Sequence, residues 1–365
     1  MADPLLFQPI SLRGTEVRNR LWVPPMCQYS AAADGPEQGV PNEWHLVHWG
    51  ALGRGGAGML VVEATAVVPE GRISPNCLGL WNDAQEAAFA RMLPIAQAHG
   101  ARVGIQLGHA GRKASTYPWL PGAPASSVPA AAGGWQTVAP SAVAFEGLAD
   151  PRALGTEEVY EVIAAFVRAA GRAARAGFDA VEIHAAHGYL IHEFLSPLSN
   201  LRDDEFGGSP ENRARLLREI VRGIRAAHPE LPILVRVSGD EWVAGGFDVE
   251  ATAQLVRWIA TDGADFVDAS SGGNVAGAAI PVGPSYQVGI AARLRGAGLP
   301  VGAVGLITSP EQAEGILATG QADVVSVGRP ALAQPHLPLQ WAHALRAPHA
   351  ADLVPSPYWR ANFGR

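Results

Sequence analysis

The sequence predicts an α/β fold, a (β/α)₈ TIM barrel, on two observations. Eight short runs rich in Val and Ile recur along the chain, and each ends in a polar or Gly-rich loop before a helical stretch. Nearly all of these runs are apolar on both faces, as strands of a parallel sheet covered by helices are. Eight such units favour closure into a barrel, with a doubly wound sheet as the alternative. We expect one domain over residues 1–365.

The first elements lie between residue 7 and the first loop. Residues 7–20 predict a short hairpin, turning at Gly14, that covers the bottom of the barrel. The first strand begins at Leu21 and ends at Pro24 and Pro25, because proline cannot donate to a strand ladder. The loop that follows contains three candidate site residues, Met26, Cys27 and Tyr29.

The other seven strands alternate with helices. We expect them within residues 58–67, 101–111, 179–188, 232–240, 264–273, 300–307 and 322–330. Helix start signals stand at Asp83, Thr156 and Ser209, and Ser309 with Gln312 is typical of a capping box. Residues 114–148 interrupt the alternation of strands and helices, because this segment is too long and too rich in Pro, Ala and Gly for an ordinary loop. We predict that it passes over the mouth of an active site.

Composition excludes several classes of function. The chain has 27 basic and 34 acidic residues and lacks a Lys/Arg block, so we expect no nucleic-acid partner. It has neither a secretory leader nor a run of about 18 apolar residues, which predicts a cytoplasmic protein that does not enter a membrane. Two cysteines are too few for an iron–sulfur cluster or a four-thiolate zinc site, and we interpret Cys77 as inert. The expected partner is a small molecule.

Polar side chains on three neighbouring strands are predicted to point into the barrel. Strand alternation places Gln106, Glu182, His184 and Arg236 inward, with Glu182 as a candidate partner of Arg236. Burying each such group without a partner costs about 1–3 kcal/mol. A bound polar ring system would supply the partners.

The loops after the last two strands predict a phosphate site. They contain Gly305 and the pair Gly328 and Arg329, which offer close backbone approach and a positive charge. Together with the inward polar groups, they indicate a phosphorylated planar cofactor.

The stretch VEIHAAHGYLIHEFL, residues 181–195, presents His184, His187 and Tyr189 where a strand ends. Taken alone, it leaves metal binding, nucleophilic catalysis and acid catalysis open. A zinc site of a metal-dependent hydrolase would need a third ligand, for which His192 is the nearby candidate. However, a strand end followed by a loop is not the helix on which the HxxH spacing suits zinc, so we favour no metal.

Several motifs, in this order, resemble the Old Yellow Enzyme family of flavin-dependent ene-reductases, in particular its cysteine-bearing, thermophilic-like subclass. The resemblance covers residues 7–360. It rests on PPMCQYS, NEWHLVH, VEATAV, GIQLGHAGRKA, HAAHGYLIHEFLSPLSNLRDDEFGGSPENR, GAVGLIT and SVGRPAL.

The resemblance implies FMN as cofactor, with its phosphate at Gly305, Gly328 and Arg329. Arg236 would lie at the N1/O2 edge, where reduction leaves negative charge. The residues implied around the ring are Pro24, Pro25, Met26, Cys27, Ala64 and Gln106.

The resemblance also implies a reaction. NADPH or NADH would reduce FMN, which then reduces the C=C bond of an activated alkene, an α,β-unsaturated carbonyl compound or a nitroalkene. His184 and His187 would hold the oxygen of this substrate while Tyr189 donates the proton. Cys27 would tune the flavin, and Tyr29 would cap the pocket.

The resemblance also implies that the chain forms an oligomer. Arg360 would reach the substrate site of a neighbouring subunit, which predicts a homodimer or homotetramer. A flavin-binding sensor without a substrate remains an alternative. A dienoyl-thioester reductase or amine dehydrogenase on the same barrel is disfavoured, since those carry a cysteine cluster and a second nucleotide-binding module.

Overall fold

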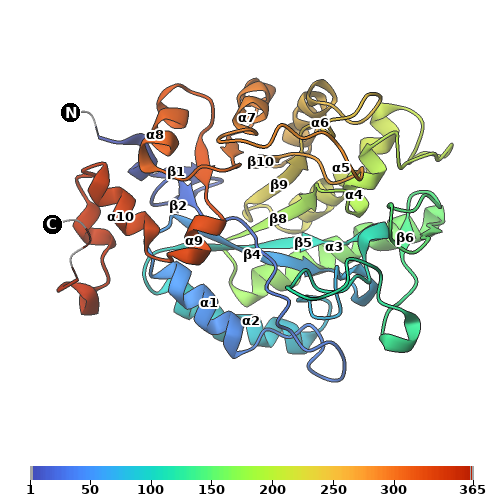
Figure 1. Cartoon of the computed structure of the whole chain (residues 1–365), viewed down its shortest axis with the longest axis horizontal. Coiled ribbons are helices and arrows are strands. Elements are labelled where there is room, and N and C mark those ends of the chain that lie inside the picture. The colour runs from blue at the N-terminus through green and yellow to red at the C-terminus, as the bar shows by residue number, and fades with distance from the viewer. Residues whose placement is uncertain (1–2, 362, 364–365) are drawn as a thin grey trace.

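A parallel eight-stranded sheet forms the centre of the molecule (Figure 1). The computed structural model describes residues 3–361 and 363, so residues 1, 2, 362, 364 and 365 of the predicted domain lie outside it. In the order in which they hydrogen-bond, the strands are β3 (Leu21–Trp22), β12 (Val324–Ser326), β11 (Val301–Ala303), β10 (Phe266–Ser270), β9 (Ile233–Ser238), β8 (Ala180–Ala185), β5 (Arg102–Gly108) and β4 (Met59–Ala66).

The sheet closes between its first and last strands. Val23 bridges Leu60, and the Val23 amide donates to the Met59 carbonyl at 2.9 Å. The Val61 amide returns a bond of 2.9 Å to the Val23 carbonyl. Strand β3 is short because two prolines follow Val23 and can donate no further ladder bonds. The predicted TIM barrel is therefore confirmed, and the doubly wound sheet is not the fold.

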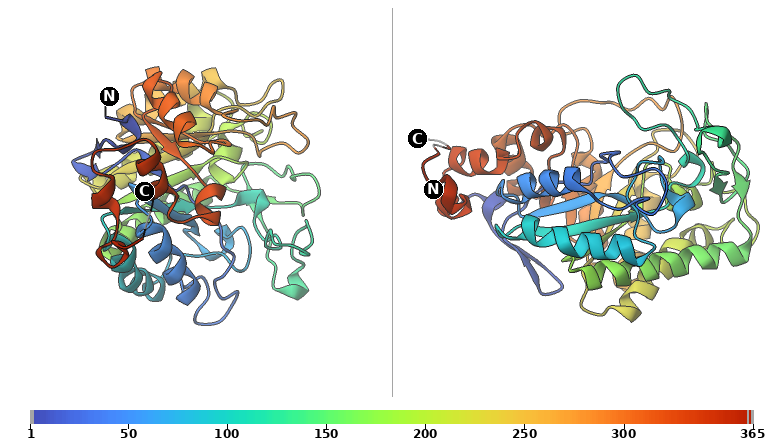
Figure 2. Two further views of the ribbon diagram at one scale, coloured as in Figure 1. Left: turned by 60° about the vertical axis from the view of Figure 1, so that its left-hand side comes forward. Right: turned by 90° about the horizontal axis from the view of Figure 1, so that it is seen from below.

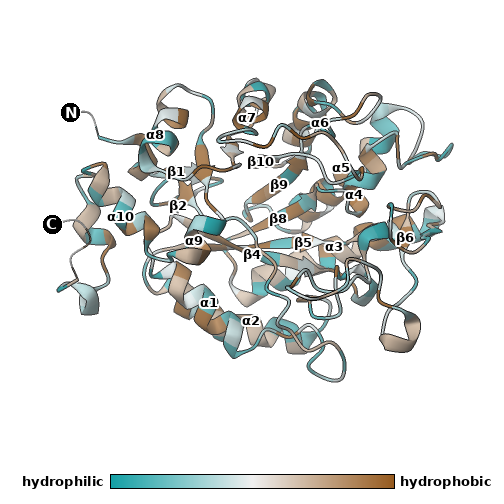
Figure 3. Ribbon diagram, viewed as in Figure 1, coloured by the Kyte–Doolittle hydropathy of each residue, from teal (hydrophilic) through white to brown (hydrophobic). Residues whose placement is uncertain are grey.

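Helices surround the barrel, and their apolar faces cover the apolar outer face of the strands (Figure 3). Ser209 caps its helix as predicted, whereas the caps of the two preceding long helices are Asn82 and Gly155, one residue before the predicted ones. Half of the predicted capping box forms, because the Ser309 side chain accepts from the Gln312 amide. The helices are α1 (Glu43–Gly53), α2 (Asp83–Gln97), α3 (Thr156–Ala176), α4 (Leu190–Leu195), α5 (Pro210–Ala227), α6 (Val249–Asp262), α7 (Val288–Leu294), α8 (Pro310–Ala318), α9 (Arg329–Ala333) and α10 (Leu337–Ala344).

A hairpin closes the amino-terminal end of the barrel. Strands β1 (Ile10–Leu12) and β2 (Thr15–Val17) pair antiparallel around Gly14, whose φ of 80° suits glycine. Leu12 and Val17 pack in one cluster with Phe266 and other residues from the starts of the barrel strands. The predicted hairpin and its position are confirmed. Both chain ends lie near this end of the barrel (Figures 1 and 2).

The long segment after β5 lies at the opposite end of the barrel from the chain termini (Figure 1). It contains the two-residue strands β6 (Val138–Ala139) and β7 (Arg152–Ala153), which pair with each other. Its backbone is tied down where it leaves the barrel, since the Thr116 amide donates to the Ile73 carbonyl at 2.9 Å. Among the described residues, no helix has the length and apolar character needed to cross a membrane.

Candidate active site

The barrel interior contains polar side chains at the positions that strand alternation predicts. Gln106 Nε2 donates to Glu182 Oε1 at 2.7 Å, and both residues are buried. Arg236 Nε lies 3.3 Å from Asp268 Oδ2, so its carboxylate partner is Asp268 of β10, the strand paired with β9, and not Glu182. Burial, reinforced by the charge of Asp268, raises the pKa of Glu182 to about 8. Glu182 is therefore protonated at neutral pH.

A cavity of about 840 Å³ opens at the carboxyl end of the strands. It brings together residues from the β3 loop (residues 24–30), from the histidine-bearing segment and from the last two loops of the barrel. The long segment after β5 reaches the cavity through Trp119, in agreement with its predicted course over the mouth. Eight predicted site residues line this cavity, namely Pro24, Pro25, Met26, His187, Arg236, Gly305, Gly328 and Arg329.

The two ends of this cavity fit a planar group with a phosphate. At one end, a Cβ on Gly305 would lie 2.9 Å from Gln287 Nε2, and one on Gly328 would lie 3.2 Å from Met26 Sδ, so the glycines leave the backbone exposed beside Arg329. Elsewhere in the cavity wall, Arg236 Nε is buried and makes no hydrogen bond, although it lies 3.3 Å from Asp268 Oδ2. Such a donor is costly to leave unused and is available to an acceptor on a bound ring. The residues present therefore fit FMN.

His184, His187 and Tyr189 form a cluster at the end of β8. The ring centroids of His184 and His187 lie 5.2 Å apart with perpendicular planes, and those of His184 and Tyr189 lie 4.9 Å apart at 86°. The Ala186 amide donates to His184 Nδ1 at 3.3 Å, which leaves the proton of a neutral ring on Nε2. His187 Nε2 lies 2.8 Å from Ser270 Oγ. Both histidine rings are thus oriented by fixed neighbours.

The three side chains of this cluster are uncharged hydrogen-bond donors. Burial lowers the pKa of His184 and His187 well below the usual value, and the charge of Arg236 lowers it further. Burial raises the pKa of Tyr189 well above its usual value, so the phenol keeps its proton. Neutral imidazole N–H groups beside a protonated phenol can hold an oxygen and deliver a proton nearby.

The other predicted residues are placed as follows. Ala64, His184 and Tyr189 line a second, narrow cavity, while Gln106 lies deeper in the barrel. Cys27 and Tyr29 are half-buried in the β3 loop. Arg360 lines a separate cavity beside α10 with Trp359, so the fold does not bring it to the site of its own chain.

Cys77 has a neighbour that sequence reasoning missed. Its thiol hydrogen-bonds with that of Cys27, and this bond, together with burial, raises the pKa of the Cys27 thiol well above the usual value. Both cysteines are free thiols. The interpretation of Cys77 as a residue without a role stays a prediction.

Lys113 is a second residue that was not predicted. Its Nζ donates to the carbonyls of His187 and Gly273, both at 2.8 Å, and lies 5.3 Å from the centre of the Tyr189 ring. Burial lowers the pKa of Lys113 to about 8. The motif GIQLGHAGRKA contains this residue, but only the fold reveals which carbonyls it holds.

A buried acid supports the β3 loop. Glu63 Oε2 accepts from the Gln28 amide at 2.8 Å, and Glu63 Oε1 lies 3.5 Å from His45 Nε2. Burial raises the pKa of Glu63 well above its usual value. Burial also lowers the pKa of His45 to about 4, with a smaller contribution from His48. Burial therefore disfavours the charged form of both members of this His–Glu pair.

The histidines do not assemble the zinc site considered above. His192 uses Nδ1 to accept from the Gly188 amide at 2.9 Å, and its Nε2 lies 3.1 Å from Glu241 Oε1. Nδ1 is therefore engaged by a backbone amide, and Nε2 faces a carboxylate oxygen of the protein. Over residues 3–361 and 363, no group of three His, Cys, Asp or Glu side chains is arranged to hold a metal ion.

Several known proteins are similar to this chain in sequence and in fold. Residues 5–347 match the model of the NADH:flavin oxidoreductase / NADH oxidase family. An NADPH dehydrogenase of Listeria monocytogenes is 44% identical over 333 residues, which cover 91% of this chain and 92% of the relative. An NADPH dehydrogenase of Geobacillus thermodenitrificans is 41% identical over 360 residues, covering 98% and 99%. The solved old yellow enzyme homologue from Zymomonas mobilis superposes with a TM-score of 0.77 at 29% identity, covering 93% of this chain and 92% of that one.

Proposed function

We propose that this chain, which belongs to the NADH:flavin oxidoreductase / NADH oxidase family and is an FMN- and NAD(P)H-dependent oxidoreductase, is an ene-reductase. Its substrate would be an alkene activated by a carbonyl or nitro group. The observation that carries this proposal is the cluster of His184, His187 and Tyr189, three neutral donors of which His187 lines the flavin cavity.

Bound FMN supplies the hydride that NADPH or NADH provides. His184 donates through Nε2–H to the oxygen of the activating group, and His187 holds the same oxygen from the perpendicular ring. Holding this oxygen withdraws electron density from the alkene, so that its β carbon becomes electrophilic. Tyr189 then gives its proton to the α carbon and recovers one from solvent.

Arg236 has a separate role in this proposal. Its guanidinium would lie beside the bound ring and would favour the reduced cofactor, because reduction leaves negative charge on the ring. Gly305, Gly328 and Arg329 would hold the phosphate of bound FMN. The wall of Pro24, Pro25 and Met26 excludes water from one side of the ring.

Two finer assignments belong to the same proposal. We assign the chain to the cysteine-bearing subclass, in which the Cys27 thiol on the β3 loop would lie beside the flavin edge and tune the cofactor potential. Tyr29 caps the substrate pocket. Arg360, which lies away from the site of its own chain, would complete the site of a neighbouring subunit in a homodimer or homotetramer.

The decisive experiment separates the two half-reactions. The FMN-loaded protein is reduced with NADPH in the absence of air, and cyclohexenone is then added while the flavin absorbance is followed. Rapid return of the oxidised spectrum with formation of cyclohexanone supports an ene-reductase. A reduced spectrum that persists with cyclohexenone and with a nitroalkene would instead indicate a flavin-binding sensor.

His184→Ala tests the oxygen clamp in the same protein. Phenols resemble the enolate-like oxygen of the reaction, so this variant should bind 4-hydroxybenzaldehyde about tenfold more weakly, because a hydrogen bond to a charged oxygen is lost. Titration of the flavin absorbance measures the dissociation constant. Unchanged phenol affinity would remove His184 from the clamp.

A further inference from the structure

The turn after β8, residues 186–189 and here called the β8 turn, has an unusual backbone. His187 and Gly188 both adopt positive φ, 60° and 71°. Positive φ is uncommon for a residue with a side chain and requires support from its surroundings. Because this turn separates His184 from Tyr189, its shape determines how the three rings of the cluster face one another.

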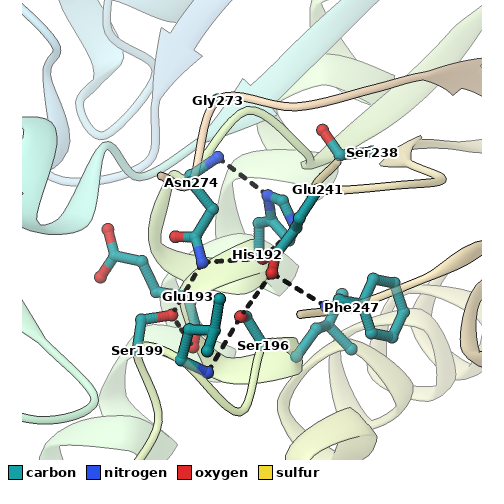
Figure 4. A network of polar contacts seen from close by, with 12 residues as sticks. His192, Glu193, Ser196, Ser199, Ser238, Glu241, Phe247, Gly273 and Asn274 are labelled. Carbon is teal, nitrogen blue, oxygen red and sulfur yellow. Dashed lines mark hydrogen bonds and ion pairs between the residues drawn. The ribbon is translucent and has the colours of Figure 1, made fainter. Parts of the chain in front are cut away.

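His192 provides that support from below. Its Nδ1 accepts the Gly188 amide at 2.9 Å, so the proton of the neutral ring lies on Nε2. Figure 4 shows His192 next to Glu241. That nitrogen lies 3.1 Å from Glu241 Oε1. His192 and Glu241 are fully buried, so neither group has water as an alternative partner.

Glu241 is a fixed anion that selects this tautomer. Burial alone would raise its pKa, but hydrogen bonding from His192, from the Phe247 amide and from Ser196 outweighs burial, and the net pKa is lowered. The Phe247 amide donates to Oε2 at 2.8 Å and Ser196 Oγ donates to it at 3.0 Å. Oε1 accepts from Asn274 Nδ2 at 2.7 Å. An anion so held requires a donor on the facing nitrogen of His192.

Asn274 links this network to the other wall of the site. It lies in the loop after β10, and its Oδ1 accepts from Arg112 Nη2 at 2.9 Å. The same loop contacts the β8 turn directly, because a Cβ on Gly188 would lie only 2.3 Å from the Gly273 carbonyl oxygen. The two loops are therefore fixed to each other through backbone contact and through Glu241.

We propose that His192, held in one tautomer by Glu241, is a positioning residue for the β8 turn and thereby for the His184, His187 and Tyr189 cluster. It touches neither substrate nor flavin. This inference rests on the proposed function, because it assigns the network to the oxygen clamp and to the proton donor.

Two substitutions at one position test the proposal. His192→Leu removes the acceptor for the Gly188 amide, whereas His192→Asn keeps it, since Asn Oδ1 occupies nearly the place of His Nδ1. In the FMN-loaded protein, His192→Leu should weaken 4-hydroxybenzaldehyde binding about tenfold and slow flavin reoxidation by cyclohexenone at least as much, because misplaced groups lose their alignment. His192→Asn should retain most of both.

A readout without cofactor makes the test independent of the reaction. In the flavin-free protein, hydrogen exchange of a peptide spanning residues 186–190 should accelerate about tenfold in His192→Leu and much less in His192→Asn, because one hydrogen bond protects the Gly188 amide. Reduction of bound FMN by NADPH should change less than threefold in both variants.

Ile220→Val on α5 is the matched control for a general loss of stability. Ile220 is fully buried in the outer helical layer. Its truncation to Val removes a buried methyl group and lowers the stability of the protein, but Ile220 does not contact the His192 network. Equal effects of His192→Leu and His192→Asn, or an Ile220→Val variant with the same loss of phenol affinity, would overturn the positioning role. A wild-type protein that binds no phenol and reduces no alkene would instead refute the proposed function.

Discussion

Two buried histidine–glutamate pairs support the two loops of the site, and they differ in charge. Beneath the β8 turn, Glu241 is surrounded by donors that lower its pKa, so it is an anion beside His192. Beneath the β3 loop, Glu63 accepts one amide, its pKa is raised, and His45 faces it uncharged. Glu241 is therefore charged beside its histidine, whereas burial favours the uncharged form of Glu63, because the number of surrounding donors differs.

The comparison teaches that the two loops are built for different tasks. The β8 turn holds groups that must meet a substrate oxygen in one geometry, and a charged network with many partners specifies one arrangement. The β3 loop provides an apolar wall and a thiol, and a neutral pair anchors it without a strong local field. The four predictions below test this difference, from the largest expected effect to the smallest.

Tyr189→Phe and Cys27→Ala compare the two loops in the reaction itself. Loss of the proton donor should slow reoxidation of the reduced flavin by cyclohexenone about 100-fold or more, while reduction by NADPH stays within about threefold. Cys27→Ala should change both half-reactions only several-fold, through the cofactor potential. Anaerobic stopped-flow absorbance measures both steps. A Tyr189→Phe variant slowed equally in both would show that Tyr189 is not the proton donor.

Glu241→Gln removes the buried anion that faces His192. The amide nitrogen of the new side chain would face the Phe247 amide, donor against donor, and His192 would lose its anion. We expect the free energy of unfolding to fall by about 2 kcal/mol, as measured by urea denaturation of the flavin-free protein. A change below about 0.5 kcal/mol would mean that Glu241 is not held as an anion.

His45 gives the β3 loop a pH dependence. Its pKa is about 4 in the folded protein and is ordinarily 6.5, so between these values the unfolded chain binds more protons. The free energy of unfolding therefore rises with pH from about 4 to 6.5 and falls as the solution is acidified through that window. His45→Gln should remove about 1 kcal/mol of this dependence in urea titrations between pH 5 and 6.5. An unchanged slope would place the His45 pKa near its ordinary value.

Glu63→Gln should have the smallest effect of the four. Burial already favours the uncharged carboxyl of Glu63, so an amide of the same shape, with its oxygen toward the Gln28 amide, should cost less than about 0.5 kcal/mol. Urea denaturation at pH 7 measures it beside Glu241→Gln. If the free energy of unfolding fell equally in Glu63→Gln and Glu241→Gln, the two glutamates would not differ in charge.

The sequence was sufficient for the barrel and for the direction of its polar side chains, because strand alternation and proline are local properties. Inward-facing Gln106 and Arg236 followed from a count along each strand. The partner of Arg236 did not, since Asp268 comes from another strand and its distance depends on the closed sheet. For the same reason the contact of His192 with Glu241 was missed, as 49 positions separate them and neither forms a motif alone.

The backbone contact between Gly188 and Gly273 also limits how the enzyme can be altered. A Cβ on Gly273 would lie 2.7 Å from His187 Cα, and one on Gly188 would lie 2.3 Å from the Gly273 carbonyl oxygen. Substitutions at these two positions should therefore disrupt the turn, so a library designed to find new substrates should leave both glycines unchanged. Diversity is better directed to Trp119, which is 91% exposed at the cavity mouth and can vary in size without displacing the loops.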